Sequence, residues 1–395
     1  MDAPGLSALL TPAGWALLES LPPYDEATAW SLGERLRAAG HDPGLVAAAL
    51  TQCRLRARAK AKFGSFADAM LFTAEGLEQA TRLDVAARHA QRFKAAGCHR
   101  VADLGCGIGG DAMALAGLDL EVLAVDRDEV TASVATVNLR HWPSAVVRRE
   151  DVRETDLSGL GAAFLDPARR TARGKRVLDP RQAEPPLGFV EEVAARLPAV
   201  GAKVAPGIPH ELVPAGAEAQ WVSVDGDVVE AGLWFGTLAR EGVGRSALVL
   251  RSGDGASAAS VDGRDMPVPD VGPVGQYLFE PDGAVIRAGL VGQVAKAVGG
   301  RLVDRSIAYV TADHPTRTPL ARTYVVDDVL PFGLKALRTY LHDRDVGRLT
   351  IKKRGTALQP EQLRRQLRLS GSQEATIVLT RVRGQQSVLV CRPLG

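Results

Sequence analysis

The sequence predicts an α/β fold: a doubly wound parallel sheet, preceded by a helical region and followed by a small basic α+β module. Three observations lead to this prediction. A short apolar strand at residues 101–104 runs into a glycine-rich turn and a helix, VADLGCGIGGDAMALA. Further apolar strands at residues 121–125, 145–147 and 162–165 follow at spacings typical of strand–helix–strand units. Residues 331–395 then repeat helix and strand patterns of their own.

Helices are expected throughout residues 1–90. Apolar residues recur there at three- and four-residue spacing in the segments 10–21, 26–40, 45–63 and 70–93. Basic side chains on the third of these segments, Arg54, Arg58 and Lys62, form either a solvated helix face or a contact line for phosphates. The sequence alone leaves both interpretations open.

The glycine-rich turn fits two ligand classes. Gly105, Gly107 and Gly110 satisfy the spacing of a dinucleotide-binding turn. Asp103, Gly105, Gly107 and Gly109 satisfy D-x-G-x-G-x-G, which resembles the motif of class I S-adenosylmethionine methyltransferases. A third interpretation is a tight turn with no ligand. Glycines suit a turn on which a ligand lies, because a Cβ atom would collide with that ligand.

Electrostatics favours S-adenosylmethionine over a nucleotide. A carboxylate at Asp103, at the end of the first strand, would repel a pyrophosphate and attract the ammonium group of a bound methionine moiety. Asp111, just after the glycines, is expected to cap the following helix.

Two further acidic residues suit the nucleoside part of the cofactor. Asp126 ends the second strand, about 20 residues after the glycines, where one carboxylate can accept hydrogen bonds from both ribose hydroxyls. This position serves either cofactor. Asp151 follows the third strand, where the methyltransferase class commonly places an acid near the adenine amino group; a plain surface acid is the alternative.

The fourth strand ends in Asp166, Pro167 and Ala168, followed by Arg169 and Arg170. Ligands of doubly wound sheets lie beyond the carboxyl ends of the strands, so this loop should face the methyl donor. It resembles the [D/N/S]-P-P-[Y/F/W] motif of amino methyltransferases, which implies that Asp166 and Pro167 accept hydrogen bonds from an exocyclic amine. Ala168 and Arg169 depart from that motif, so no aromatic ring is present to stack on a base.

The loop after this motif is strongly basic. Five of its residues between positions 169 and 176 are Arg or Lys, namely Arg169, Arg170, Arg173, Lys175 and Arg176. Such runs are usually solvated, but this one begins beside the predicted catalytic carboxylate. We therefore expect Arg169 and Arg170 to bind substrate phosphates.

The C-terminal module carries most of the positive charge. Residues 331–395 contain 13 Lys and Arg against 4 Asp and Glu, a net charge of +9, whereas the whole chain is +2 and the other residues therefore sum to −7. A small module this basic suits an anionic polymer. Lys352, Lys353 and Arg354 are consecutive, and Arg364, Arg365 and Arg368 line one side of the second helix of the module.

Three separated motifs resemble one bacterial methyltransferase family with a C-terminal THUMP-like domain. These are the L-E-Q-A-T segment at residues 77–81, D-P-A-R-R at 166–170, and the run from Val346 to Arg381. The resemblance implies RNA as the substrate class. The segment before the glycine turn also resembles the trimethylguanosine-synthase-like branch, in which a threonine-containing turn closes over the cofactor. This implies that Thr81, with Gln79, lines the site; a linker helix packed on the sheet is the alternative.

Composition excludes several other classes of protein. The four cysteines are scattered, which gives neither a zinc site nor a disulfide framework and fits a reducing cytoplasm. No signal peptide and no apolar run long enough to span a membrane are present, so we expect a cytoplasmic protein. The predicted divisions are a helical region (1–90), a methyltransferase domain (91–251), a connecting α/β segment (252–330) and the THUMP-like domain (331–395).

The sequence therefore predicts an S-adenosylmethionine-dependent methyltransferase that modifies RNA. A nitrogen (or oxygen) acceptor is favoured over carbon 5 of a pyrimidine, because that carbon is commonly activated by a cysteine and none lies near D-P-A-R-R. Two alternatives remain. The altered motif is compatible with an inactive cofactor-binding fold that acts as an RNA scaffold, and the glycine spacing is compatible with an NAD-dependent oxidoreductase.

Overall fold

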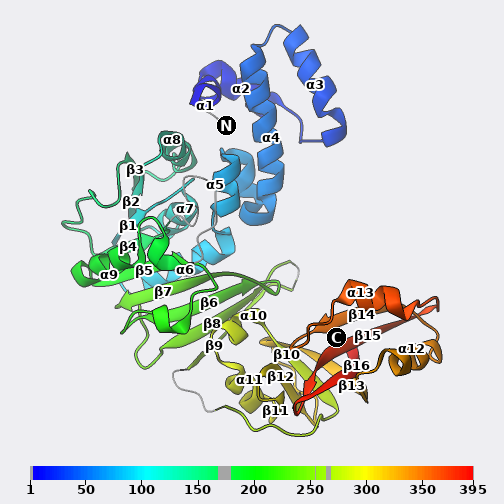
Figure 1. The fold of residues 1–395 in the computed structure, drawn as a ribbon. Coiled ribbons are helices and arrows are strands. Elements are labelled where there is room, and N and C mark those ends of the chain that lie inside the picture. Colours follow the sequence, from blue (N-terminus) through cyan, green and yellow to red (C-terminus); the bar gives the residue numbers. More distant parts are fainter. Residues whose placement is uncertain (1–2, 168–178, 254, 264–267, 395) are drawn as a thin grey trace. The chain divides into compact units, whose positions relative to one another are not determined.

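A computed structural model describes residues 3–167, 179–253, 255–263 and 268–394 (Figure 1). The chain divides into two compact units. Unit 1 comprises Met1–Ala217 and Leu233–Ala239, and unit 2 comprises Glu218–Gly232 and Arg240–Gly395. Among the described residues, none of the helices combines the length and the apolarity needed to cross a bilayer.

Unit 1 begins with helices, as predicted. Four α-helices precede a 3-10 helix and two more α-helices: α1 (Ala3–Leu9), α2 (Pro12–Ser20), α3 (Glu26–Ala38), α4 (Pro43–Phe63), η1 (Gly64–Ala69), α5 (Ala74–Gln79) and α6 (Leu83–Ala95). The long helix α4 begins where Asp42 accepts a hydrogen bond from the Leu45 backbone N–H. It ends at Gly64, whose φ of +56° favours glycine.

The sheet of unit 1 is parallel through five strands: β1 (Arg100–Leu104), β2 (Glu121–Asp126), β3 (Ala145–Arg149), β4 (Ala162–Leu165) and β5 (Ala199–Val204). Their order is β3-β2-β1-β4-β5, followed by β7 (Asp227–Gly236), of which residues from Leu233 onward belong to this unit. The chain reverses direction across the sheet after β3, so β1 and β4 flank a topological switch point. The predicted doubly wound arrangement is confirmed.

In the described part of the chain, the connections between these strands contain α7 (Gly110–Ala116), α8 (Glu129–Asn138) and α9 (Leu187–Arg196). The short 3-10 helices η2 (Pro180–Gln182) and η3 (His210–Leu212) lie before α9 and after β5. Apolar residues of α7, β1, β2 and β4 form one buried cluster with α4 and α6. The fifth strand, β5, is buried along its whole length. Its register pairs Leu165 with Ala202, so the next residues along, Asp166 and Lys203, lie side by side.

An extended stretch, Met70–Phe72, runs through the interior of unit 1 and is almost fully buried. Two buried amide side chains satisfy its backbone. The Gln52 side chain donates to the Phe72 carbonyl (2.7 Å) and accepts from the Phe72 N–H (2.9 Å). Asn138 accepts from the Leu71 N–H (2.8 Å) and donates to the carbonyls of Leu71 (3.1 Å) and Ile108 (2.8 Å). Asn138 thus holds this stretch against the glycine-rich turn.

Replacing Asn138 with alanine is expected to destabilise unit 1 by about 3 kcal/mol or more, because each buried backbone group left without a partner costs roughly 1–3 kcal/mol. Thermal denaturation followed by circular dichroism would measure the effect. The matched control is Gln91→Ala, since the Gln91 amide is exposed and accepts a hydrogen bond from Arg88 (3.0 Å). Equal shifts for the two variants would contradict the assigned role of Asn138.

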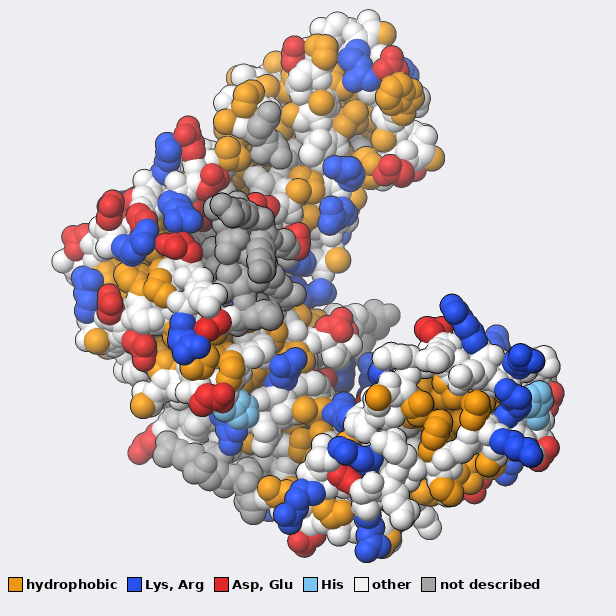
Figure 2. Space-filling view, in the orientation of Figure 1, with side chains coloured by type: hydrophobic (Ala, Val, Ile, Leu, Met, Phe, Trp, Pro, Cys, Tyr) orange, Lys and Arg blue, Asp and Glu red, His pale blue; other side chains and the backbone are white. Residues whose placement is uncertain are grey.

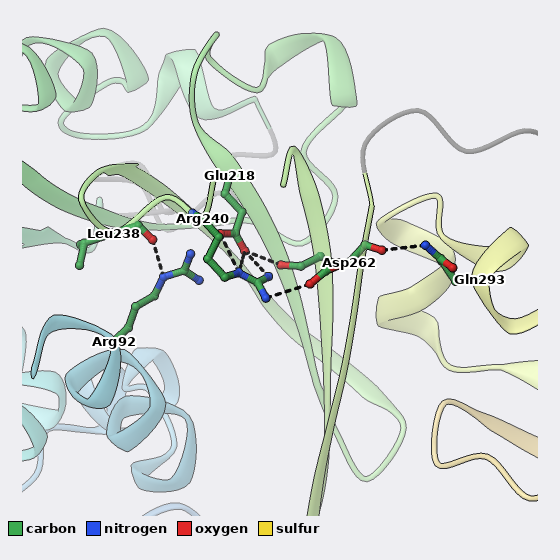
Figure 3. A network of polar contacts seen from close by, with 7 residues as sticks. Arg92, Glu218, Leu238, Arg240, Asp262 and Gln293 are labelled. Atoms are coloured by element: carbon green, nitrogen blue, oxygen red, sulfur yellow. Dashed lines mark hydrogen bonds and ion pairs between the residues drawn. The ribbon is translucent and has the colours of Figure 1, made fainter. Parts of the chain in front are cut away.

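The first part of unit 2 contains β6 (Glu218–Val224), β8 (Arg245–Arg251) and β9 (Ser257–Gly263) beside the start of β7. Strand β6 pairs with β8 in parallel, and β9 is antiparallel to β8. Figure 3 shows Arg240 between Glu218 and Asp262. Its guanidinium lies 2.7 Å from the fully buried Glu218 carboxylate and 3.1 Å from Asp262, so the buried charge is paired.

The rest of unit 2 is one seven-stranded sheet with the order β11-β12-β10-β13-β16-β15-β14. Its strands are β10 (Tyr277–Pro281), β11 (Arg301–Asp304), β12 (Ile307–Ala312), β13 (Ala321–Pro331), β14 (Val346–Lys353), β15 (Gln373–Val382) and β16 (Gln385–Pro393). Its helices are α10 (Gly283–Arg287), α11 (Val291–Ala297), α12 (Leu334–His342) and α13 (Pro360–Leu367).

The helix and strand pattern predicted after residue 331 agrees with these elements. The boundary predicted at residues 330/331, however, falls inside this sheet. Strand β13 ends at Pro331 and pairs along its length with β16, so the strands from β10 onward share a sheet with the C-terminal ones.

Candidate active site

The glycine-rich turn lies between the ends of β1, β2 and β4. The backbone N–H groups of Gly105 and Cys106 both donate to the Val125 carbonyl at 2.9 Å. Gly105 has a φ of +87°, and a Cβ atom there would lie 3.0 Å from the Asp166 carbonyl oxygen. A side chain at this position would therefore meet both backbone strain and a close contact. Gly107 and Gly109 also have positive φ, +56° and +86°.

Asp103 is a buried carboxylate without a partner. Its residue is 1% exposed, and within the described part of the chain neither carboxylate oxygen has a hydrogen-bond partner of good geometry, although the Ala112 backbone N–H is near enough to favour the charged form. Burial, followed by the charges of Asp111 and Asp166, raises the pKa of Asp103 well above its usual value, although Lys203 opposes this shift. Such a group is costly unless a cation or donor comes to it. An ammonium group of a ligand would satisfy it.

Asp126, at the end of β2, is held by two backbone donors. The N–H groups of Gly107 (3.0 Å) and Asp128 (2.9 Å) each donate to a different oxygen of its carboxylate. Partial burial raises the pKa of Asp126 despite these hydrogen bonds. Each oxygen keeps a further lone pair, so the carboxylate can still accept from a ribose diol.

Asp151 follows β3 and pairs with Arg153. The guanidinium donates to both carboxylate oxygens, at 2.9 and 2.6 Å. The hydrogen bonds from Arg153 lower the pKa of Asp151 to about 2. Asp151 is therefore an ionised acceptor, as an adenine amino group would require, and Arg153 also orients it.

Thr81, Asp111 and His89 form a buried group beneath the turn. Helix α7 begins at Gly110 after a left-handed Gly109, so the prediction that Asp111 caps this helix is wrong. The helix begins two residues too early for Asp111 to be its N-cap. Gly109 occupies the N-cap position instead, in a left-handed conformation that favours glycine. The Asp111 carboxylate instead lies 2.8 Å from His89 Nδ1. Burial alone would raise the pKa of Asp111, but the hydrogen bond and charge of His89 keep it below its usual value.

Lys203, on β5, is a site residue that sequence reasoning missed. Its side chain is 2% exposed and its ammonium group forms an ion pair with Asp166. It also donates to Thr81 Oγ1 at 3.0 Å. The sequence did contain one indication of it, namely a lysine within the apolar strand AVGAKV. A buried lysine needs a partner of opposite charge.

The other predicted site residues are distributed as follows. Pro167 is buried after Asp166. Arg169 and Arg170 lie outside the described residues. The consecutive residues Lys352, Lys353 and Arg354 do not form one patch: their side chains contact, respectively, Glu280 (2.5 Å), the Leu358 carbonyl (3.1 Å) and the Ala308 carbonyl (3.4 Å).

Comparison with known proteins identifies the family. An uncharacterized S-adenosylmethionine-dependent methyltransferase of Mycobacterium tuberculosis, found in strains CDC 1551 and H37Rv, is 34% identical over 358 residues, which cover 86% of this chain and 95% of the relative. This chain belongs to the S-adenosylmethionine-dependent methyltransferase family. The crystal structure of a Porphyromonas gingivalis W83 protein assigned as a methyltransferase matches this methyltransferase with a TM-score of 0.74 at 19% identity, over 95% of this chain and 100% of that one.

Two family models match parts of this methyltransferase. The THUMP domain-like family matches residues 321–393, and a domain of unknown function matches residues 2–59. The predicted THUMP-like domain is therefore confirmed, and its match begins at the first residue of β13.

The residues of the site fit the cofactor of this methyltransferase family. The unpartnered Asp103 carboxylate suits the ammonium of the methionine moiety, and Asp126 suits the ribose. When bound, S-adenosylmethionine supplies an electrophilic methyl group on a sulfonium centre. The prediction of S-adenosylmethionine over a nicotinamide cofactor is confirmed by the family.

Proposed function

We propose that this methyltransferase modifies RNA, transferring the methyl group to a nitrogen. The observation that carries the proposal is the basic THUMP-like module, whose matched region includes β13 to β16 and whose residues 331–395 have a net charge of +9. A charge excess of this size, confined to one module, supports binding to an anionic polymer. No aromatic pair typical of base-stacking RNA modules was found in the sequence of its strands, so contact through the backbone and shape of the RNA is favoured.

The loop after β4 suits an amine acceptor. Asp166 follows a central strand, and its backbone lies beside the glycine turn. Its carboxylate pairs with Lys203 and is partly exposed, so it can still accept a hydrogen bond from an N–H group. The amine lone pair then forms the new N–C bond while the methyl–sulfur bond breaks and its electron pair returns to sulfur; the surplus amine proton passes to solvent. Placement of the nucleophile in line with this bond is the main demand on the protein.

A cysteine-dependent reaction at pyrimidine C5 is not supported. Cys106 is the cysteine in the glycine turn, and burial raises the pKa of its thiol well above the usual value. The reactive form of a cysteine nucleophile is the thiolate, which this environment disfavours.

A groove between α12 and α13 is the proposed contact for the RNA backbone. It has a volume of about 540 Å³ and is lined by residues of both helices and of the segments next to them: Leu334, Arg338, Gln359, Glu361, Gln362, Arg365, Gln366 and Arg368. Arg365 and Arg368 are exposed, whereas Arg364 is paired with Glu361 at 2.6 Å. In the space-filling view, basic side chains border this module (Figure 2).

Reversing two groove charges, Arg365→Glu with Arg368→Glu, is expected to weaken RNA binding at least tenfold and to reduce the slope of log K against log salt by about 2, one unit per lost phosphate contact. Fluorescence anisotropy with labelled RNA at several salt concentrations would measure both. Arg348→Glu with Arg383→Glu is the matched control: it changes the charge equally, and Arg383 shares the left-handed backbone of Arg368. If both double variants lost RNA affinity equally, binding would depend only on nonspecific charge, and the groove would not be the RNA contact.

The proposed reaction is tested with total RNA from a deletion strain of the source organism and methyl-labelled S-adenosylmethionine. The RNA is digested and its nucleosides are identified by mass spectrometry. A labelled N-methylated nucleoside is expected. Label found in protein or in a small metabolite, with none in RNA, would overturn the substrate class.

A further inference from the structure

Lys203 occupies an unusual place for a lysine. It lies within β5, between Ala202 and Val204, and its side chain is 2% exposed. A buried ammonium group is costly unless it is paired and hydrogen-bonded. Lys203 meets this requirement through the ion pair with Asp166 and hydrogen bonds to Thr81 Oγ1 (3.0 Å) and the Gln79 carbonyl (3.4 Å).

These partners come from two motifs that lie far apart in the sequence. Asp166 belongs to the D-P-A-R-R motif after β4. Gln79 and Thr81 belong to the L-E-Q-A-T segment at the end of α5, more than 80 residues earlier. One ammonium group thus joins the catalytic loop to the turn assigned to the cofactor.

The α5 side of this contact is itself well anchored. The Lys62 ammonium donates to the carbonyls of Leu77 (2.8 Å), Glu78 (2.8 Å) and Ala80 (2.7 Å), so it satisfies the free carbonyls at the end of α5. Lys62 belongs to the basic line of α4, for which the sequence left a phosphate contact open, and in the structure its ammonium group binds these carbonyls. The carbonyl of Gln79 and the hydroxyl of Thr81 are therefore presented to Lys203 from a fixed turn.

Other charged groups surround the pair. Asp103 and Asp111 both act electrostatically on this region with Lys203, and His89 is hydrogen-bonded to Asp111. Asp111 is hydrogen-bonded to His89, and Asp103 is assigned to the ammonium group of the cofactor. Asp166 is therefore the carboxylate whose charge Lys203 neutralises by a direct ion pair. Loss of the Lys203 charge would thus fall mainly on Asp166.

We propose that Lys203 is a positioning residue for methyl transfer: it holds the Asp166 carboxylate ionised and in one orientation, and it fixes that carboxylate relative to the Thr81 turn. This inference rests on the proposed function, in which Asp166 accepts a hydrogen bond from the acceptor amine. Lys203 itself does not touch the acceptor. Its effect is to keep Asp166 available as an acceptor at pH values where the same carboxyl, without its counter-charge, would take up a proton.

The test compares Lys203→Met, Lys203→Arg, Asp166→Asn and the double variant Lys203→Met with Asp166→Asn. Single-turnover methyl transfer to total RNA is measured from pH 5 to 9, with S-adenosylhomocysteine affinity measured by calorimetry. Lys203→Met is expected to slow transfer about 100-fold, the usual cost of a misplaced reacting group, while S-adenosylhomocysteine binds within about threefold of wild type. The acidic limb of its pH profile moves to higher pH, because the partly buried Asp166 carboxyl has lost its neighbouring cation.

Two comparisons separate positioning from general stability. Lys203→Arg retains the cation, so it restores the acidic limb to its wild-type position and recovers part of the rate. In the Asp166→Asn background, Lys203→Met adds little further loss, since the carboxylate it positions is gone. Lys94→Met is the control, because Lys94 contacts the Leu118 carbonyl (2.8 Å) and none of these site residues. Equal, additive losses in transfer and cofactor affinity, with an unmoved pH profile, would overturn the proposal.

A second readout needs no methyl acceptor, so it survives if RNA proves to be the wrong substrate. In Lys203→Met the Asp166 carboxylate loses its counter-charge, so its ionised form becomes less favourable in the folded protein and destabilises it more as the carboxyl ionises with rising pH. The difference in melting temperature between wild type and Lys203→Met, measured from pH 5 to pH 8, should therefore widen as pH rises. The double variant should reduce that trend to the part contributed by Asp103, on which the Lys203 charge also acts. A constant difference across this range would contradict the inference even if RNA methylation were established.

Discussion

Replacing Asp103 with asparagine is expected to stabilise the cofactor-free protein and to weaken S-adenosylmethionine binding severely. The carboxylate is buried, has no hydrogen-bond partner in the described part of the chain, and lies in the field of Asp111 and Asp166. Removing its charge should stabilise the free protein by roughly 1–3 kcal/mol, because a buried neutral amide costs less than a buried charge near two other carboxylates. Cofactor binding should lose about 2–5 kcal/mol, or roughly 30-fold to several thousand-fold in affinity, since the ligand ammonium would lose its partner.

The pH dependence of stability gives an independent prediction of whether Asp103→Asn stabilises or destabilises the protein. The pKa of Asp103 is higher in the folded state than in the unfolded chain. Between those two values the folded state binds more protons, so the contribution of Asp103 to stability falls as pH rises through the folded-state pKa. The melting temperature of Asp103→Asn should therefore exceed that of wild type by an amount that grows from pH 4 upward. S-adenosylmethionine, which needs the ionised carboxylate, should bind wild type more weakly at acidic pH.

Thermal melts with and without S-adenosylmethionine, together with calorimetry, would check both effects. Asp111→Asn is the matched control, because this carboxylate is equally buried but already paired with His89 at 2.8 Å. Removal of the Asp111 charge should destabilise the protein, whereas removal of the Asp103 charge should stabilise it. If Asp103→Asn instead lowered the melting temperature and kept the cofactor affinity, the assignment of Asp103 to the ammonium would fail.

The strand ends were predictable because each carries a local signal. Asp103, Asp126 and Asp166 each lie at or directly after the end of a short apolar run, and parallel strands bring such ends to one edge of the sheet. Each of these carboxylates was therefore predictable from the few residues around it, although the fold brings them together from positions as much as 60 residues apart or more. The helices of residues 1–90 were predictable for a similar reason, since their periodicity is local.

Residues whose partners are distant in the sequence had no such signal. The pairing of Asn138 with Leu71, of His89 with Asp111 and of Lys203 with Asp166 depends on tertiary contacts. The same limit explains Lys352, whose ammonium faces Glu280 across a sheet instead of facing solvent as one of a basic triplet. A run of charges shows composition, but strand alternation sends its members to opposite faces.

Asparagine at position 166 is expected to reduce methyl transfer by a factor of about 100 to 10,000, the range typical of a group that handles the reacting proton or its hydrogen bond. The amide keeps one acceptor oxygen and nearly the same shape, but it loses the charge paired with Lys203. Cofactor affinity should remain close to wild type, because Asp103 and Asp126 are unchanged. The Lys203 ammonium then lacks its counter-charge, so the variant should also melt at a lower temperature.

This variant also separates an enzyme from a cofactor-binding scaffold, the alternative that Ala168 and Arg169 leave open. Methyl transfer to total RNA and S-adenosylhomocysteine binding are measured on the same preparations of wild type and Asp166→Asn. An enzyme predicts measurable transfer by wild type that the substitution removes while binding persists. A scaffold predicts no transfer by either protein and unchanged RNA affinity, because the groove between α12 and α13 does not include Asp166. Undiminished transfer by Asp166→Asn would instead move the catalytic role away from the end of β4.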